Sequence, residues 1–130
     1  MSEEAEVLKT RTMRFALDVC ALIRGLPAFE PGPTARGQLA RSSTSVAFNY
    51  RASCRARSHA EFTAKIGVVA EEADESQGWL EFIEAANLIR TKESARLLAE
   101  ATELCRIFSA SLGTAREHER NRRHRDRNSD

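Results

Sequence analysis

Arginine is the residue whose spacing in this sequence most plainly indicates a chemistry. Residues 36 to 65 hold six lysine or arginine side chains against a single acid. Arg41, Arg51 and Arg55 alternate there with small residues and with one phenylalanine, Phe48. Guanidinium groups bind phosphate and an aromatic ring can stack on a base, so the stretch is either one face of a structural helix or a surface that binds nucleic acid.

The next charged segment has the opposite sign. Residues 71 to 84 hold six acids and no base. Four-helix bundles can bind two metal ions through inward-pointing Glu and Glu-x-x-His pairs, but no Glu-x-x-His occurs here and the three histidines lack metal-ligand spacing. We therefore expect no metal and no other cofactor, and we expect these acids to lie on a solvated or interface face.

Other catalytic signatures are missing from the sequence as well. There is no P-loop, no dinucleotide-binding glycine pattern and no serine nucleophile elbow, so we expect a protein that is not an enzyme. The three cysteines are widely spaced, form no C-x-x-C and follow no signal peptide, which predicts a reduced, cytoplasmic protein with structural thiols. No apolar run approaches the roughly eighteen residues of a membrane span, and we expect no membrane association.

Helices are the elements that must position these side chains. No proline occurs between Thr34 and Ser111, which a β-rich fold would rarely allow. Apolar residues recur at helical spacing, and capping signals stand at Thr34, Ser58 and Thr91. We predict an all-α protein, an antiparallel up-and-down four-helix bundle, with helices over about 10–25, 34–57, 58–88 and from 91 onward.

The two ends of the chain are expected to lie outside this bundle. We predict a flexible N-terminus over residues 1–8, the bundle over 9–113, and a disordered or frayed helical tail over 114–130. The tail carries six arginines and four acids, so it could be a solubilising extension or a non-specific phosphate-binding segment. The arginines that could bind phosphate there are Arg120, Arg122, Arg123, Arg125 and Arg127.

Two helix faces remain after the core is assigned, and their charges are complementary. Arg41, Phe48, Arg51 and Arg55 share one face of the second helix, and the acidic aromatic flank of the third helix is formed by Glu72, Glu75, Trp79 and Phe82. Three arrangements are open. The arginines and acids could pair within one bundle, they could pair between subunits with the aromatic rings as buried anchors, or the arginine face could bind nucleic acid.

The sequence also resembles a known family over about residues 9 to 112. The most specific matching parts are Gln38 to Ser45, Asn49 to Arg51, Arg55 to Ser58, Ala60 to Phe62, Lys65, Glu72 to Glu75, and Trp79 with Leu80. These parts are similar to the four-helix bundle proteins encoded in intervening sequences of 23S rRNA genes, sometimes labelled ribosomal-protein-like. That family has no established enzymatic function.

The resemblance implies a bundle that assembles as a ring-shaped homopentamer. It also implies a more distant relationship to the accessory protein of diversity-generating retroelements, a basic pentamer that binds nucleic acid and a reverse transcriptase. This chain differs in charge, since residues 1 to 113 hold 14 lysine or arginine residues and 15 acids.

Two functions from different classes follow. The first is an oligomeric accessory protein that binds RNA or DNA phosphates with little sequence preference through Arg41, Arg51, Arg55, Lys65 and the tail arginines. The second is a protein-interaction scaffold without a nucleic-acid partner. In the scaffold, ring contacts would use the surface formed by Phe48, Arg51, Arg55, Glu72, Glu75, Trp79 and Phe82.

Overall fold

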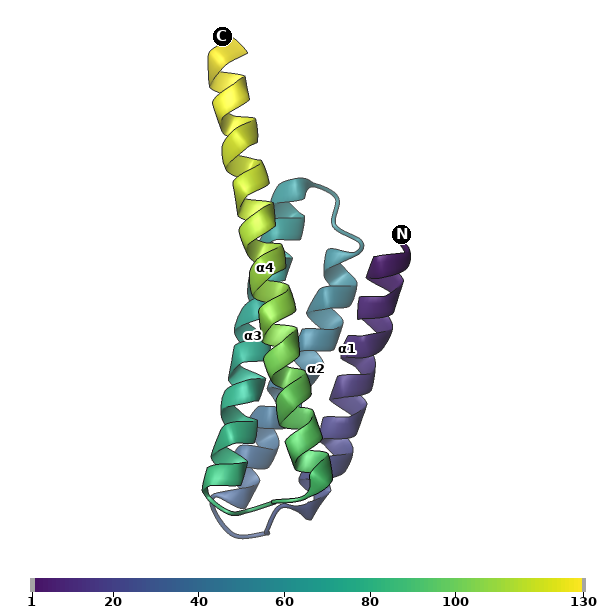
Figure 1. Ribbon diagram of the computed structural model, residues 1–130, viewed down its shortest axis with the longest axis vertical. Coiled ribbons are helices and arrows are strands. Elements are labelled where there is room, and N and C mark those ends of the chain that lie inside the picture. The colour runs from purple at the N-terminus through teal and green to yellow at the C-terminus, as the bar shows by residue number, and fades with distance from the viewer. Residues whose placement is uncertain (1, 130) are drawn as a thin grey trace.

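The computed structural model describes residues 2–129, and every regular element in that range is helical. The elements are α1 (Glu3–Leu22), a short 3₁₀ turn η1 (Ile23–Gly25), α2 (Gly32–Ser53), α3 (His59–Ala85) and α4 (Lys92–Ser129). The four α-helices run alternately up and down (Figure 1). The predicted all-α fold and its four helices are therefore confirmed. Assembly into a ring stays a prediction, because the structure contains one chain.

The first helix begins earlier than the apolar pattern alone indicated. The Ser2 hydroxyl accepts from the Ala5 amide at 3.1 Å, and three acids occupy the first turn, where the positive end of the helix dipole stabilises them. Residues 3–8, expected to be flexible, are helical in the structure for this reason. Apolar periodicity could not find this turn, because its residues are mostly exposed.

Ser58 and Thr91 begin helices as predicted, but the predicted cap at Thr34 is wrong. Helix α2 begins at Gly32, and the Thr34 amide inside its first turn donates to the Glu30 carboxylate at 3.1 Å. The Ser58 hydroxyl accepts from the Glu61 amide at 3.1 Å and begins α3, and the Thr91 hydroxyl accepts from the Ser94 amide at 3.1 Å and begins α4. The Glu61 carboxylate turns to Arg57 instead of returning to the cap, with 3.4 Å between Oε2 and Nε. The second helix ends at Ser53, four residues earlier than predicted.

One core occupies the space between the four helices. The apolar stripes lie in it, and the Tyr50 and Phe108 rings meet there with 5.3 Å between their centroids. Small polar residues on α2 and α3 complete the core where these two helices meet, and the Ser76 hydroxyl donates to the Ser42 hydroxyl at 2.9 Å with both side chains buried. The small side chains allow α2 and α3 to pack closely, which positions the charged residues beside them.

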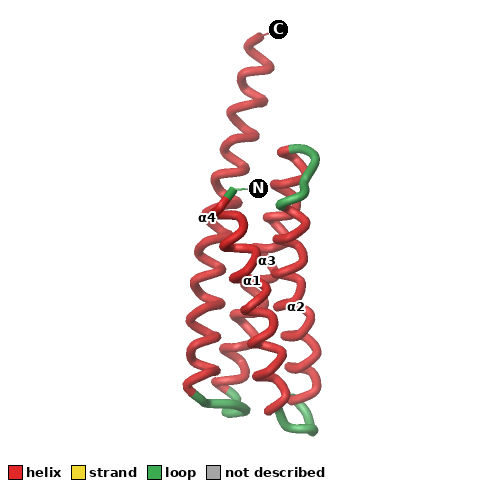
Figure 2. Tube along the Cα trace, turned by 90° about the vertical axis from the view of Figure 1, so that its right-hand side faces the viewer, coloured by secondary structure: helices red, strands yellow, loops and turns green. Residues whose placement is uncertain are grey.

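The fourth helix is much longer than the bundle. It continues past the connection between α2 and α3 and projects alone from that end of the molecule (Figures 1 and 2). Its last buried residue is Ala115, and its residues from 116 to 129 are almost all exposed. No helix within residues 2–129 combines the length and the apolar character that crossing a bilayer requires.

Candidate nucleic-acid interface

The antiparallel packing of α2 and α3 decides which charges meet. Ser42 lies opposite Ser76, so residues later in α2 lie opposite residues earlier in α3. Arg41 therefore lies near the middle of the acidic segment, whereas Arg51 and Arg55 lie beside the beginning of α3. The seam between α2 and α3 is consequently divided into two halves of different charge.

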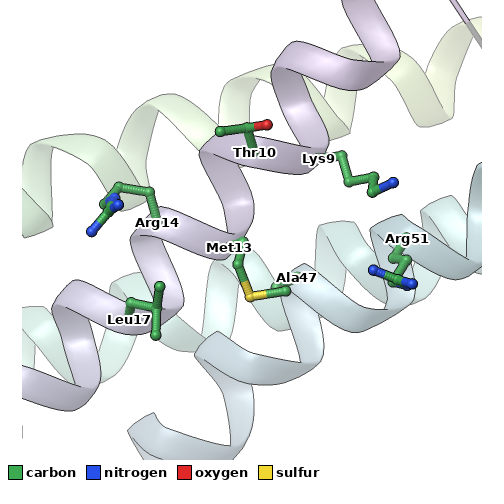
Figure 3. A pocket seen from close by; sticks show the side chains of 7 residues that line it. All are labelled: Lys9, Thr10, Met13, Arg14, Leu17, Ala47 and Arg51. Atoms are coloured by element: carbon green, nitrogen blue, oxygen red, sulfur yellow. The ribbon is translucent and has the colours of Figure 1, made fainter.

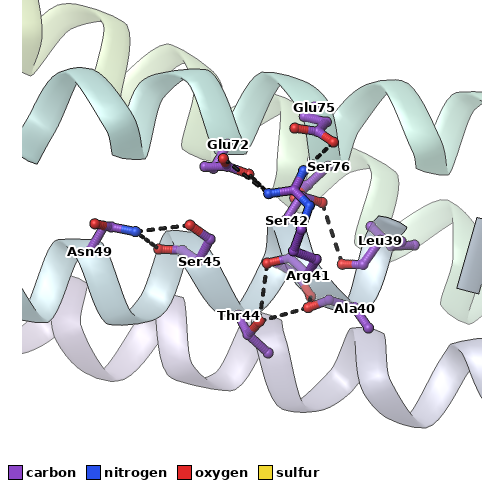
Figure 4. A network of polar contacts seen from close by, with 11 residues as sticks. Leu39, Ala40, Arg41, Ser42, Thr44, Ser45, Asn49, Glu72, Glu75 and Ser76 are labelled. Carbon is purple, nitrogen blue, oxygen red and sulfur yellow. Dashed lines mark hydrogen bonds and ion pairs between the residues drawn. The ribbon is translucent and has the colours of Figure 1, made fainter. Parts of the chain in front are cut away.

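In the paired half of the seam, which consists of Arg41, Glu72 and Glu75, the charges neutralise one another. The Arg41 guanidinium donates to both Glu72 oxygens at 3.1 and 3.2 Å and also contacts the Glu75 carboxylate (Figure 4). These hydrogen bonds raise the pKa of Arg41, and the bond to Glu75 has a larger effect than the bond to Glu72. Of the three arrangements left open by the sequence, pairing within one bundle therefore occurs for Arg41, and neither Arg51 nor Arg55 pairs with these acids in the described residues.

In the cationic half of the seam, three bases gather instead. A pocket of about 360 Å³ is lined by Phe48, Arg51, Ala52, Arg55, Glu61 and Lys65. Across residues 2–129, no carboxylate lies within ion-pair distance of Arg51, Arg55 or Lys65. Glu61, the acid of the pocket, pairs with Arg57. Three cations whose charges are not neutralised within the chain leave this pocket suited to an anion.

A second groove, between α1 and α2, meets the pocket at Arg51. It has a volume of about 260 Å³ and is lined by Lys9, Thr10, Met13, Arg14, Leu17, Ala47 and Arg51 (Figure 3). Lys9 and Arg14 were not among the predicted site residues. The sequence held only part of the signal, because the four-residue spacing of Lys9, Met13 and Leu17 places them on one face of the first helix without showing what that face packs beside.

The cations of this groove are held only loosely. Lys9 lies 4.0 Å from Glu6, and Arg14 lies 3.9 Å from Asp18, both along the exposed surface of α1. Ion pairs of this kind contribute little energy and can exchange their partners. The groove therefore extends the positive surface from the cationic half around α2 toward α1.

Exposed aromatic rings accompany both halves of the seam. The Phe48 side chain is 58% exposed at the edge of the cationic pocket, and the Phe82 side chain is 42% exposed on α3. Trp79 packs partly against the core and meets the Phe82 ring edge-on, with 5.4 Å between the ring centroids. Phe48 is thus free to stack on a base or to contact another protein.

The predicted tail arginines all lie on the projecting part of α4, away from the seam. They are exposed, and no ion pair involves Arg116 or any later arginine within the described chain. The base of this extension is fastened to α3, because a His59 ring nitrogen lies 3.0 Å from the Ala115 carbonyl oxygen and the His59 and His118 rings are 5.6 Å apart. Neither contact was predicted.

The thiols and acids offer little for catalysis. Burial raises the pKa of the Cys105 thiol to about 11, so it remains protonated and unreactive at neutral pH. All three cysteines are free. Within residues 2–129 no three His, Cys, Asp or Glu side chains are grouped closely enough to hold a metal ion.

Comparisons with known proteins agree with this architecture. The family model of the 23S rRNA-intervening sequence proteins matches residues 3–110. A crystal structure from Bacteroides thetaiotaomicron, of a protein with unknown function from the S23 ribosomal protein family, is 25% identical to this chain with a TM-score of 0.73. The match covers 81% of this chain and 97% of that one. A comparison with curated proteins gives no match.

Proposed function

This chain belongs to the 23S rRNA-intervening sequence protein family, and we propose that it is a non-enzymatic RNA-associated protein that binds phosphates through the cationic half of the seam. The family name supports an association with RNA. The charged residues of the seam support a mode of binding that depends on phosphates and needs little sequence preference.

The pocket formed by Arg51, Arg55 and Lys65 beside the exposed Phe48 is the observation that carries this proposal. Each base can neutralise one phosphate and release its counterions, while the Phe48 ring can stack on an unpaired base. Arg41 was also expected to bind phosphate, but its guanidinium is engaged by two carboxylates. We therefore leave Arg41 out of the proposed site.

A salt series with a fluorescent RNA hairpin tests the proposal. We expect the logarithm of the binding constant of the full chain to fall linearly with the logarithm of the salt concentration. Each neutralised phosphate of a duplex should contribute about 0.9 to that slope. Absence of binding near physiological salt would contradict the proposal.

A second candidate is a scaffold that binds other copies of itself, as in the ring of five that the family resemblance implies. It is favoured by the exposed apolar residues along α2 and α3, since Phe48, Val68 and Phe82 are 58%, 37% and 42% exposed. Sedimentation of the full chain and of a Phe82→Ser variant tests it. The scaffold predicts an oligomer that the substitution weakens, and a monomer at every concentration would contradict it.

A further inference from the structure

The projecting part of α4 carries an arrangement of arginines that the bundle does not explain. The family match ends at residue 110, so residues 114–129 form a feature of this chain beyond the matched region. They continue α4 as regular helix, and their base is held by the His59 contact with Ala115. The direction in which each tail side chain points therefore follows from the direction of the bundle residues earlier in α4.

Four of the tail arginines share one side of this helix. At about 100° per residue, their 4-3-4 spacing places them within an arc of about 60°. We call this set the arginine stripe, and it consists of Arg116, Arg120, Arg123 and Arg127. Arg122 and Arg125 lie at least about 100° from each of them, on the opposite side of the helix.

The arginine stripe continues the side of α4 that faces α3. Within the bundle, Thr102 accepts a hydrogen bond from Gln77 of α3 at 2.9 Å, and the Leu112 side chain lies beside Gly67 of α3. Thr102 and Leu112 fall within about 60° of the stripe on the same helical projection. Beyond the N-terminal end of α3, no helix covers this side of α4, and the extension projects past the connection between α2 and α3 (Figures 1 and 2).

The connection between α2 and α3 adds positive charge at the same end of the molecule. Arg55 and Arg57 lie in it, and both side chains are exposed. Arg57 pairs with Glu61, although the Arg57 side chain remains 89% exposed. The tail has acids of its own, and Glu119 and Asp126 flank the stripe on one side without an ion pair in the described residues. Glu117 lies about 60° from the stripe on the other side, and the exposed face between these acids remains basic along about 16 Å of helix.

We propose that the arginine stripe and the connection between α2 and α3 together bind the sugar-phosphate backbone of base-paired RNA, an inference that rests on the RNA association proposed above. A straight row of guanidinium groups matches a regular row of phosphates. Residues 114–129 contain no Phe, Tyr or Trp that could stack on unpaired bases, which favours a duplex over a single strand.

Two matched double variants of the full chain test the site. Arg120→Gln with Arg123→Gln removes two charges from the stripe, and Arg122→Gln with Arg125→Gln removes two charges from the opposite side. Arginine and glutamine have similar helix propensities, so both variants keep the tail helical, which circular dichroism can verify. The probes are a fluorescent RNA duplex and a single strand of the same length, each titrated across a salt series.

We expect the stripe variant to lower the salt slope for the duplex by about 1.8 and the opposite variant to lower it by less than about 0.5. Equal reductions of the salt slope in the two variants, or no reduction in either, would leave the proposed RNA association in place and would contradict RNA binding by the arginine stripe. Weaker binding of the duplex than of the single strand by the unsubstituted chain would also overturn it. Failure of the unsubstituted chain to bind either probe would end the proposed function itself.

Discussion

Both halves of the seam between α2 and α3 contain exposed or half-exposed arginines, and the two halves differ in what those arginines contact. In the paired half, Arg41 is held by Glu72 and Glu75. In the cationic half, Arg51 and Arg55 lie beside Lys65 in a pocket where no ion pair neutralises them within residues 2–129. Helical register, and not the overall balance of charge, thus decides which arginines stabilise the fold and which can bind a partner.

Forcing α2 and α3 apart should have the largest effect on stability, because both halves of the seam depend on the close packing of these two helices. Ser76→Leu places a large side chain where Ser42 and Ser76 are both buried and hydrogen-bonded. We expect the free energy of unfolding to fall by about 2–3 kcal/mol, measured by urea denaturation. Ser76→Ala is the control and should cost about 1 kcal/mol or less, since the Ser42 hydroxyl keeps its bond to the Leu39 carbonyl. Equal stability of Ser76→Leu and the unsubstituted chain would show that the seam tolerates spreading.

Reversing charge in the cationic half should separate binding from assembly. We expect Arg51→Glu with Arg55→Glu to weaken RNA binding by more than about tenfold near physiological salt, because two attractive charges become repulsive toward phosphate. The sedimentation coefficient of the protein should not change. Loss of an oligomer with unchanged RNA affinity would instead favour the scaffold and contradict the assignment of these two arginines.

Alkaline pH should affect the packed body of the bundle more than its exposed surface. Burial raises the pKa of Cys105 from near 9 to about 11, and burial together with the neighbouring Cys54 raises the pKa of Tyr50. A raised pKa in the folded state means that folding favours the protonated form. The contribution of Cys105 to the free energy of unfolding is therefore complete below pH 9 and is lost as the pH rises through 11.

Urea denaturation between pH 8 and pH 11 measures this dependence. We expect the free energy of unfolding to decrease over the range, and to decrease less steeply in Cys105→Ala because one of the two titrating groups has been removed. The Tyr50 contribution should remain in that variant. The same pH dependence in both proteins would contradict a raised pKa for Cys105.

Stiffening the base of the α4 extension should produce the smallest effect. Gly113 lies inside α4, and a methyl group added there would meet no atom within 4 Å. We therefore expect Gly113→Ala to raise the free energy of unfolding by about 0.5–1 kcal/mol, measured by thermal or urea denaturation. RNA affinity should be retained, because the arginine stripe is proposed to act as part of a straight helix. A large loss of affinity would show that the extension must bend.

Much of the fold could be predicted from the sequence because periodicity and caps are local signals. Apolar residues at helical spacing predicted buried stripes, and Leu39, Val46 and Leu104 are buried in the structure. Capping signals predicted the helix starts at Ser58 and Thr91. The start of α1 was missed because its stabilising features are Ser2 and a group of acids, which produce no apolar periodicity in the sequence.

The site could be predicted only in part, because it depends on contacts between helices. The sequence located the charged faces, but one helix does not reveal its register against another, so it could not show that Glu72 and Glu75 pair with Arg41. Lys9 was missed because its role depends on the packing of α1 beside Arg51. The contact between His59 and the base of the α4 extension likewise joins residues far apart in the sequence.

The central claim is that Arg51 and Arg55, which form no ion pair within residues 2–129, bind RNA, whereas Arg41, which two carboxylates hold, does not. Two double variants of equal net charge test it most directly: Arg51→Gln with Arg55→Gln, and Arg41→Gln with Arg106→Gln. The second pair removes arginines engaged with Glu72, Glu75 and Glu103. In a salt series with an RNA duplex, we predict that the first variant lowers the salt slope by about 1.8 and that the second leaves it nearly unchanged. Equal salt slopes in the two variants would contradict this claim, because RNA binding would then depend on total charge alone.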